Sequence, residues 1–192
     1  MSTRTKVAIF ASGNGSNMQA FMDYEELACD IVLLVCDQPG AVVIDRAKRH
    51  DVPSFVCSPQ DMKSKQAYEQ AIIEQLRASE VEWIILAGYM RLIGPDLLHA
   101  FDGKIINIHP SLLPSFKGLH AIEQAMEAGV KVTGVTIHYV DEGMDTGPII
   151  AQEAVQIELG DSLQEVEEKI HAVEHRLYPK TVNEMIQSIH RS

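Results

Sequence analysis

The stretch "KVAIFASGNGSN", Lys6 to Asn17, decides the expected fold. Its first half, "KVAIFA", is a short apolar run with little polar alternation, which is typical of a strand buried on both faces of a parallel sheet. Its second half, "SGNGSN", is a glycine-rich turn that leads into a helical pattern. Backbone N–H groups at the start of such a helix form a site for an anion. The stretch therefore predicts a strand–loop–helix unit with an anion-binding loop.

The same alternation continues along the chain. Further apolar, strand-like runs occupy Asp30–Cys36, Val81–Gly88 and Lys104–His109. Helical patterns separate or follow them: "AVVIDRAKRH", "KSKQAYEQAIIEQLRAS" and "HAIEQAMEAG". Strands that alternate with helices indicate a mostly parallel sheet with helices on both faces.

The pattern changes near the C-terminus. Val132–Val140 alternates polar and apolar residues, and Ile149–Ile157 follows after the short connection "DEGMDTGP". Such a connection cannot hold a crossover helix, so the two strands should be antiparallel. A long helical pattern follows, with Ser162 and Glu165 as a capping box and with Pro179 expected to kink or restart the helix. We expect an α/β, Rossmann-like open sheet, twisted, of about seven strands, with an antiparallel C-terminal pair.

Composition limits the classes of protein that fit. A chain of 192 residues predicts one domain with a sizeable core. The formal net charge of -11 and the lack of a long basic run argue against nucleic acid as a partner. The apolar run near the N-terminus is too short for a signal peptide or a membrane span, so no membrane association is expected. Three cysteines without metal or redox spacing, Cys29, Cys36 and Cys57, suggest a reducing cytoplasm.

The glycine-rich loop by itself leaves its role open. A dinucleotide site needs the spacing G-x-G-x-x-G, and Met18 stands where the third glycine belongs. Asp37, at the end of the second expected strand, resembles the acid that binds a ribose in such sites. The loop can therefore be a tight turn, an anion site or part of a dinucleotide site.

The stretch "NIHPSLLP", Asn107 to Pro114, carries the first candidate catalytic pair. Residues two apart in a strand share a face, so Asn107 and His109 should point together away from Ile106 and Ile108. They end a strand of the expected parallel sheet, where open α/β folds bind ligands. From this stretch alone, a structural histidine and a catalytic histidine are equally good interpretations.

The connection "DEGMDTGP" gathers three acidic residues, Asp141, Glu142 and Asp145, among glycines. Taken alone, it is best explained as a solvated acidic turn. If the loop folds back over the sheet, one carboxylate could reach His109 and favour the protonated imidazolium.

The remaining histidines have ordinary explanations. His138 lies in an alternating strand, and none has the spacing of a metal site, so we expect no metal.

Four motifs together carry a resemblance to a known family: "SGNGSN", "AGYMRLIG", "NIHPSLLP" and "DEGMDTGPI". In combination they resemble the phosphoribosylglycinamide formyltransferases, small folate-dependent enzymes of purine synthesis, and the similarity extends to "EHRLYP". The resemblance implies direct transfer of a formyl group from 10-formyltetrahydrofolate to the amine of glycinamide ribonucleotide. It implies that Asn107, His109 and Asp145 carry the chemistry without a metal.

The resemblance also implies two sets of binding residues. The phosphate and ribonucleotide set is Gly15, Ser16, Asn17 and Glu174. The folate set is Lys65, Met90, Arg91, Leu92, Ile93, Asn107, Asp141, Glu142, Gly143, Met144 and Asp145. Lys65 is arginine in some relatives, so it keeps the charge but lacks the planar fork. Within one domain, residues of about 1–100 are expected to form a nucleotide-phosphate half and residues of about 101–192 a catalytic and folate half.

Other activities of the same fold are alternatives. Methionyl-tRNA formyltransferases resemble this sequence but carry a further C-terminal domain and need a tRNA-binding surface. Formyltetrahydrofolate hydrolases resemble it but carry an N-terminal regulatory domain, for which the first strand leaves no room. A dinucleotide-binding oxidoreductase or a non-catalytic nucleotide-binding domain would be a different class. We expect only small-molecule substrates, and a monomer or homodimer in the cytoplasm.

Overall fold

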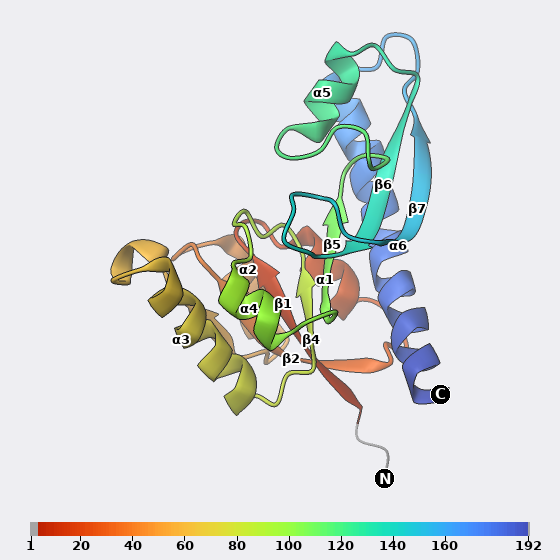
Figure 1. Ribbon diagram of the computed structural model, residues 1–192. Coiled ribbons are helices and arrows are strands. Elements are labelled where there is room, and N and C mark those ends of the chain that lie inside the picture. The colour runs from red at the N-terminus through yellow and green to blue at the C-terminus, as the bar shows by residue number, and fades with distance from the viewer. Residues whose placement is uncertain (1–3, 192) are drawn as a thin grey trace.

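The computed structural model describes residues 4–191, which form a seven-stranded sheet between two groups of helices (Figure 1). The strands are β1 (Thr5–Ala11), β2 (Cys29–Cys36), β3 (Ser54–Val56), β4 (Trp83–Leu86), β5 (Ile105–His109), β6 (Val132–Tyr139) and β7 (Ile149–Gln156). Their order across the sheet is β3-β2-β1-β4-β5-β6-β7. The first five strands are parallel, whereas β6 is antiparallel to both β5 and β7. The predicted fold class is therefore confirmed.

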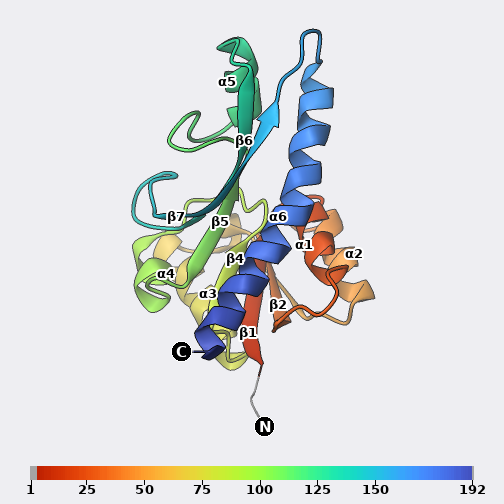
Figure 2. The ribbon, with the colours of Figure 1, turned by 90° about the vertical axis from the view of Figure 1, so that its right-hand side faces the viewer.

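Helices cover both faces of the sheet (Figure 2). An apolar core lies between the sheet and the helices on each face. The helical elements are α1 (Ser16–Met22), α2 (Val42–Arg49), the 3₁₀ turn η1 (Pro59–Asp61), α3 (Lys65–Ala78), α4 (Pro95–Ala100), α5 (Ala121–Glu127) and α6 (Leu163–Arg191). On one face, side chains such as Phe21, Val43 and Tyr178 from α1, α2 and α6 pack together. On the other face, Ile72 of α3 and Leu97 of α4 pack in the second core.

The long C-terminal helix begins as expected but does not restart at Pro179. The backbone N–H of Ser162 donates to the Glu165 carboxylate, and the N–H of Glu165 lies 3.3 Å from the Ser162 hydroxyl, as a capping box requires. The helix α6 then runs from Leu163 to Arg191 with Pro179 buried inside it. A continuous apolar face, which includes Val166, Ile170, Tyr178 and Ile186, packs on the sheet along its length and outweighs the lost backbone hydrogen bond.

The topology brings three loops to one edge of the sheet. Because β1, β4 and β5 are adjacent and parallel, the loops that follow them leave from the same edge. The backbone N–H of Ser12 after β1 donates to the carbonyl of Gly88 after β4, over 3.0 Å. Open α/β folds bind ligands in the crevice at such an edge, where the strand order reverses.

Candidate active site

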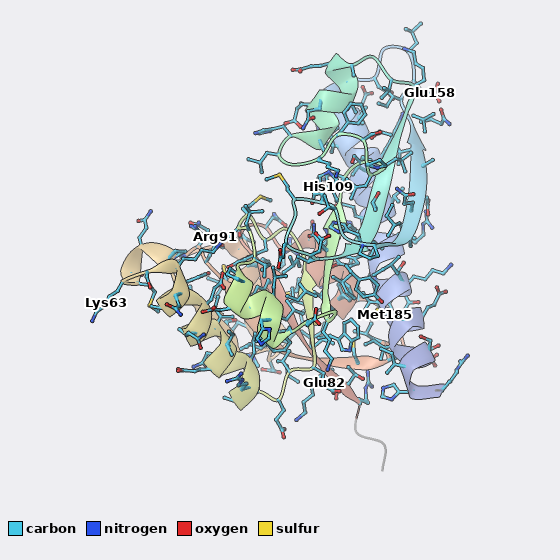
Figure 3. The ribbon with its side chains drawn as sticks, in the orientation of Figure 1. Lys63, Glu82, Arg91, His109, Glu158 and Met185 are labelled. Atoms are coloured by element: carbon cyan, nitrogen blue, oxygen red, sulfur yellow. The ribbon has the colours of Figure 1, made fainter. Side chains whose placement is uncertain are left out.

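The strand β5 ends with the two polar side chains that the sequence singled out. Ile106 and Ile108 of this strand belong to the core on the face covered by α6, so Asn107 and His109 point to the opposite face. His109 is 5% exposed, and its Nε2–H donates to the Phe116 carbonyl oxygen over 2.8 Å. Its Nδ1 atom lies toward Asp145 in the loop between β6 and β7. Figure 3 labels His109 at the end of β5.

That loop does fold back over the end of β5 and brings Asp145 to the histidine. The Asp145 Oδ2 atom lies 3.5 Å from Nδ1 of His109, and it also accepts from the backbone N–H of Gly118 over 2.8 Å. The loop is stiffened from within, because the Asp141 carboxylate accepts from the Thr146 hydroxyl and from the Gly143 N–H. Asp145 is thus held at a defined position, its side chain 12% exposed.

His138 completes this cluster, although its sequence context gave it only a structural role. In the antiparallel pairing of β5 and β6 it lies opposite Asn107, and its Nε2 atom is 3.3 Å from the Asn107 Nδ2 atom. Its Nδ1–H donates to the carbonyl of Tyr139. Burial lowers the pKa of His138, which outweighs the opposing effects of that carbonyl and of Asp145. A neutral His138 can therefore accept a hydrogen bond from the Asn107 amide. The strand register was the signal that could have identified it.

The glycine-rich loop forms one side of a cavity of about 350 Å³. Its lining comprises Ser12 to Asn17, Ala87, Gly88, Met90, Ile108, Pro110, Ile122, His171 and Glu174. The cavity therefore joins Gly15, Ser16, Asn17 and Glu174, which the sequence analysis grouped as one site. The Asn17 amide donates to the Glu174 carboxylate over 3.2 Å, across 157 positions of the chain. His171, on the same helix, was missed because nothing in the sequence relates it to the loop.

Glu174 is 6% exposed, and its burial raises the pKa of its carboxyl group despite the opposing effects of His171 and of the Asn17 hydrogen bond. The Oδ1 atom of Asn17 is buried and has no hydrogen-bond partner among residues 4–191. Buried polar atoms are nearly always paired. The unpaired Asn17 oxygen is therefore an exception among the buried polar atoms of this part of the structure.

A second cavity, of about 400 Å³, contains five of the expected folate residues. Lys65 contributes from α3, and Met90, Arg91, Leu92 and Ile93 contribute from the loop between β4 and α4. The side chains of Met90 and Leu92 are 68% and 63% exposed, which is unusual for large apolar residues and suits a surface that a ligand covers. Met90 also lines the cavity of the glycine-rich loop, so the two cavities adjoin.

The remaining folate candidates do not all share that cavity. Asp141 and Glu142 line a third one, of about 610 Å³, together with Leu98, His99 and Tyr139. Gly143 and Met144 lie in the loop between them and Asp145, and the Met144 side chain is 50% exposed. The expected folate residues are therefore divided between two different cavities, while Asn107 and Asp145 lie in the cluster with His109 and His138.

In the part of the chain that the structure describes, no group of three or more His, Cys, Asp or Glu side chains could hold a metal ion. Over the same residues, no helix is long and apolar enough to cross a membrane.

The chemistry of the cluster follows from its groups. An amide and an imidazole at one strand end can donate hydrogen bonds to an oxyanion, and a carboxylate can hold the imidazole protonated and oriented. Two cavities adjoin at Met90, and one of them is lined by Ile108 and Pro110, the neighbours of His109, so there is space for two small molecules near this strand end. The arrangement suits acyl transfer between two bound molecules.

Comparison with known proteins agrees with this class. The family model described as formyl transferase matches residues 5–182. A phosphoribosylglycinamide formyltransferase of Bacillus subtilis is 56% identical over 184 residues, which are 94% of each chain. The crystal structure of phosphoribosylglycinamide formyltransferase from Bacillus halodurans superposes with a TM-score of 0.92 at 56% identity, over 95% of both chains. A trifunctional purine biosynthetic protein of Drosophila melanogaster is 40% identical over 93% of this chain, which corresponds to 14% of that larger protein.

The chain therefore belongs to the formyl transferase family, and it is an enzyme that transfers a formyl group. Within this family it stands among the phosphoribosylglycinamide formyltransferases, which its sequence and its fold resemble over nearly their whole length. The resemblance seen in the sequence motifs is confirmed.

Proposed function

We propose that the chain transfers the formyl group of 10-formyltetrahydrofolate to the amine of N1-(5-phospho-D-ribosyl)glycinamide, in the cytoplasm and as a monomer or homodimer. The observation that carries the proposal is the contact of Asp145 with His109 beside the Asn107–His138 pair. Ile108 and Pro110, which flank His109, line one of two cavities that adjoin at Met90. Two small molecules bound in those cavities would meet at the end of β5, where the catalytic groups lie.

The substrate amine attacks the formyl carbon and creates a tetrahedral oxyanion. One N–H of the Asn107 amide points to His138, so the second N–H is available to the oxyanion. Asp145 contacts Nδ1 of His109, so the Nε2–H of this ring is the group that donates to the oxyanion. Catalytic triads work in the same way, with a carboxylate that orients the other ring nitrogen. This N–H donates to the Phe116 carbonyl, so the formyl oxygen must take the place of that carbonyl. His109 then passes protons toward the leaving folate nitrogen.

No covalent enzyme intermediate is needed, and the cysteines do not offer a nucleophile. Burial raises the pKa of Cys29 to about 12, and it also raises the pKa of the Cys36 and Cys57 thiols. A thiolate, which is the reactive form, is therefore disfavoured at each position.

The two substrates are assigned to different sides of the cluster. We assign the phosphate and ribose to the cavity of Gly15, Ser16, Asn17 and Glu174, where backbone N–H groups of the loop before α1 suit an anion. We assign the folate to Lys65, Met90–Ile93 and the Asp141–Asp145 loop. In this assignment each half of the chain serves both substrates.

A folate absorbance assay, run with and without glycinamide ribonucleotide, tests the proposal. We expect the absorbance of the formyl donor to change only when the amine acceptor is present. Donor consumption without the acceptor would instead indicate a hydrolase.

Inorganic phosphate should compete with the ribonucleotide and not with the folate, and competition against the folate would overturn the assignment of the two sides. A thermal shift with nicotinamide dinucleotides, but not with 10-formyltetrahydrofolate, would indicate an oxidoreductase.

A further inference from the structure

Asp37 is a buried carboxylate that the proposed mechanism does not use. It follows β2, is 1% exposed, and lies next to the loop between β4 and α4. Its Oδ2 atom accepts from Nε of Arg91 over 2.7 Å and from the side-chain amide of Gln38 over 3.1 Å. A buried charge is costly unless it is paired, so Arg91 is the group that makes this carboxylate tolerable. Its Oδ1 atom has no hydrogen-bond partner among residues 4–191, but the residue is buried, so Asp37 is not open to a ribose, the role that its place in the sequence suggested.

Arg91 is bound to Asp37 through only one edge of its guanidinium group. Nε donates to Asp37, and the side chain, labelled in Figure 3, remains 38% exposed and lines the cavity of about 400 Å³ that Lys65 also lines. The two terminal Nη groups have no hydrogen bond to any of residues 4–191. A guanidinium held by Nε presents its remaining N–H groups in a fixed plane, which suits a carboxylate.

The loop that carries Arg91 is tied down just before this residue. Gly88 accepts from the backbone N–H of Ser12, and the N–H of Met90 donates to the Ser12 hydroxyl over 2.9 Å. The Tyr89 hydroxyl lies 2.7 Å from the hydroxyl of Tyr68 on α3. The Asp37 contact continues this series to residue 91.

We propose that Asp37 is a positioning residue for the formyl donor. It holds the Arg91 guanidinium by Nε so that the Nη edge receives the glutamyl carboxylate of the folate. The proposal rests on the proposed function, because it takes 10-formyltetrahydrofolate as the donor. It adds a residue outside both predicted binding sets, and it assigns to that residue an effect on one substrate only.

The test compares two donors, 10-formyltetrahydrofolate and 10-formyltetrahydropteroate, which lacks the glutamate. The readout is the kcat/KM for 10-formyltetrahydrofolate divided by the kcat/KM for 10-formyltetrahydropteroate. Asp37→Asn keeps the shape but loses the charge, so the ratio should fall about tenfold, which corresponds to about 1.4 kcal/mol. The KM for glycinamide ribonucleotide should stay within about twofold. Gln38→Ala is the matched control, because it removes the other hydrogen bond to the same oxygen and should leave the ratio unchanged.

A double-mutant cycle shows whether the effect passes through Arg91. Arg91→Met should lower the ratio by itself, and Asp37→Asn should add nothing in the Arg91→Met background. A further fall in that background, or an equal fall for both donors, would overturn the proposal. If Asp37→Asn does not fold, Arg91→Lys provides the test, because lysine keeps the positive charge but lacks the planar guanidinium. A wild-type ratio of the two donors in Arg91→Lys would reject a role for the positioned guanidinium. A wild-type enzyme that transfers no formyl group would reject the proposed function instead.

Discussion

Asn107 and His138 lie directly opposite each other in the antiparallel pairing of β5 and β6, with 3.3 Å between Nδ2 of the amide and Nε2 of the imidazole. Nε2 of His138 is also 3.7 Å from Oδ1 of Asp145, while Oδ2 of that carboxylate faces His109. The four side chains therefore form one connected cluster. Because burial lowers the pKa of His138, the neutral ring can accept a hydrogen bond from the Asn107 amide and so orient it.

We expect His138→Leu to lower kcat by about tenfold, because the Asn107 amide loses the acceptor that fixes its orientation toward the oxyanion. His138→Gln can still offer a side-chain oxygen to the amide, so its loss should be smaller. Steady-state kinetics under saturation with both substrates measures both variants. A Leu variant with the wild-type kcat would show that the amide is oriented by something else.

His109→Ala should lose most of the activity while the fold persists. General acid–base groups typically contribute roughly 10²–10⁴-fold to the rate, so we expect a loss of kcat in this range. Circular dichroism provides the control for folding, since His109 is a polar residue at the end of a strand and outside both apolar cores. A loss below about tenfold would remove His109 from the mechanism.

Gly15→Ala should destabilise the protein by about 1–2 kcal/mol or more, from the cost of a left-handed backbone alone. The φ angle of Gly15 is +76°, and a Cβ atom there would lie 2.4 Å from a methyl carbon of Val43. Gly13→Ala is the matched control in the same loop, because a Cβ atom at that position meets nothing within 4 Å. Urea unfolding of both variants measures the difference, and equal stabilities would contradict the prediction.

Glu174→Gln should change how stability depends on pH. Burial raises the pKa of Glu174, so the folded state holds its proton more tightly than the unfolded state, whose pKa is near 4.5. The free energy of unfolding of the wild type therefore falls as pH rises from about 4.5 through the higher folded-state pKa. Glutamine carries no such proton, so the variant should gain stability relative to the wild type over that range.

Thermal melts of Glu174→Gln from pH 4 to pH 8 measure this difference. Glu184→Gln, at an exposed position of the same helix, is the control and should follow the wild type at every pH. The contrary result is a difference in Tm between Glu174→Gln and the wild type that is the same at every pH. That result would mean that burial does not raise the pKa of the Glu174 carboxyl group.

One strand and one α-helix of the fold were not predicted, β3 and α4. They have three and six residues, Ser54–Val56 and Pro95–Ala100, and are too short for an apolar period to stand out from the flanking loops. They form because neighbours cover them: β3 pairs with the end of β2, and Leu97 of α4 packs in the core beside α3. Their stability comes from tertiary contacts, which a local pattern does not contain.

By itself, the sequence determined the order and type of the long elements, the antiparallel C-terminal pair, the glycine-rich turn after β1 and the candidates at the end of β5. Those features depend on near neighbours in the chain, namely on the spacing of apolar residues, on glycines and on the length of a connection. It also carried enough motif pattern to indicate the family. Tertiary structure decided which side chains meet across the sheet. His138 joined the cluster through strand register, Asn17 met Glu174 across 157 positions, and Asp37 paired with Arg91. Such contacts depend on how strands align and loops fold back, and packing of the whole chain sets both.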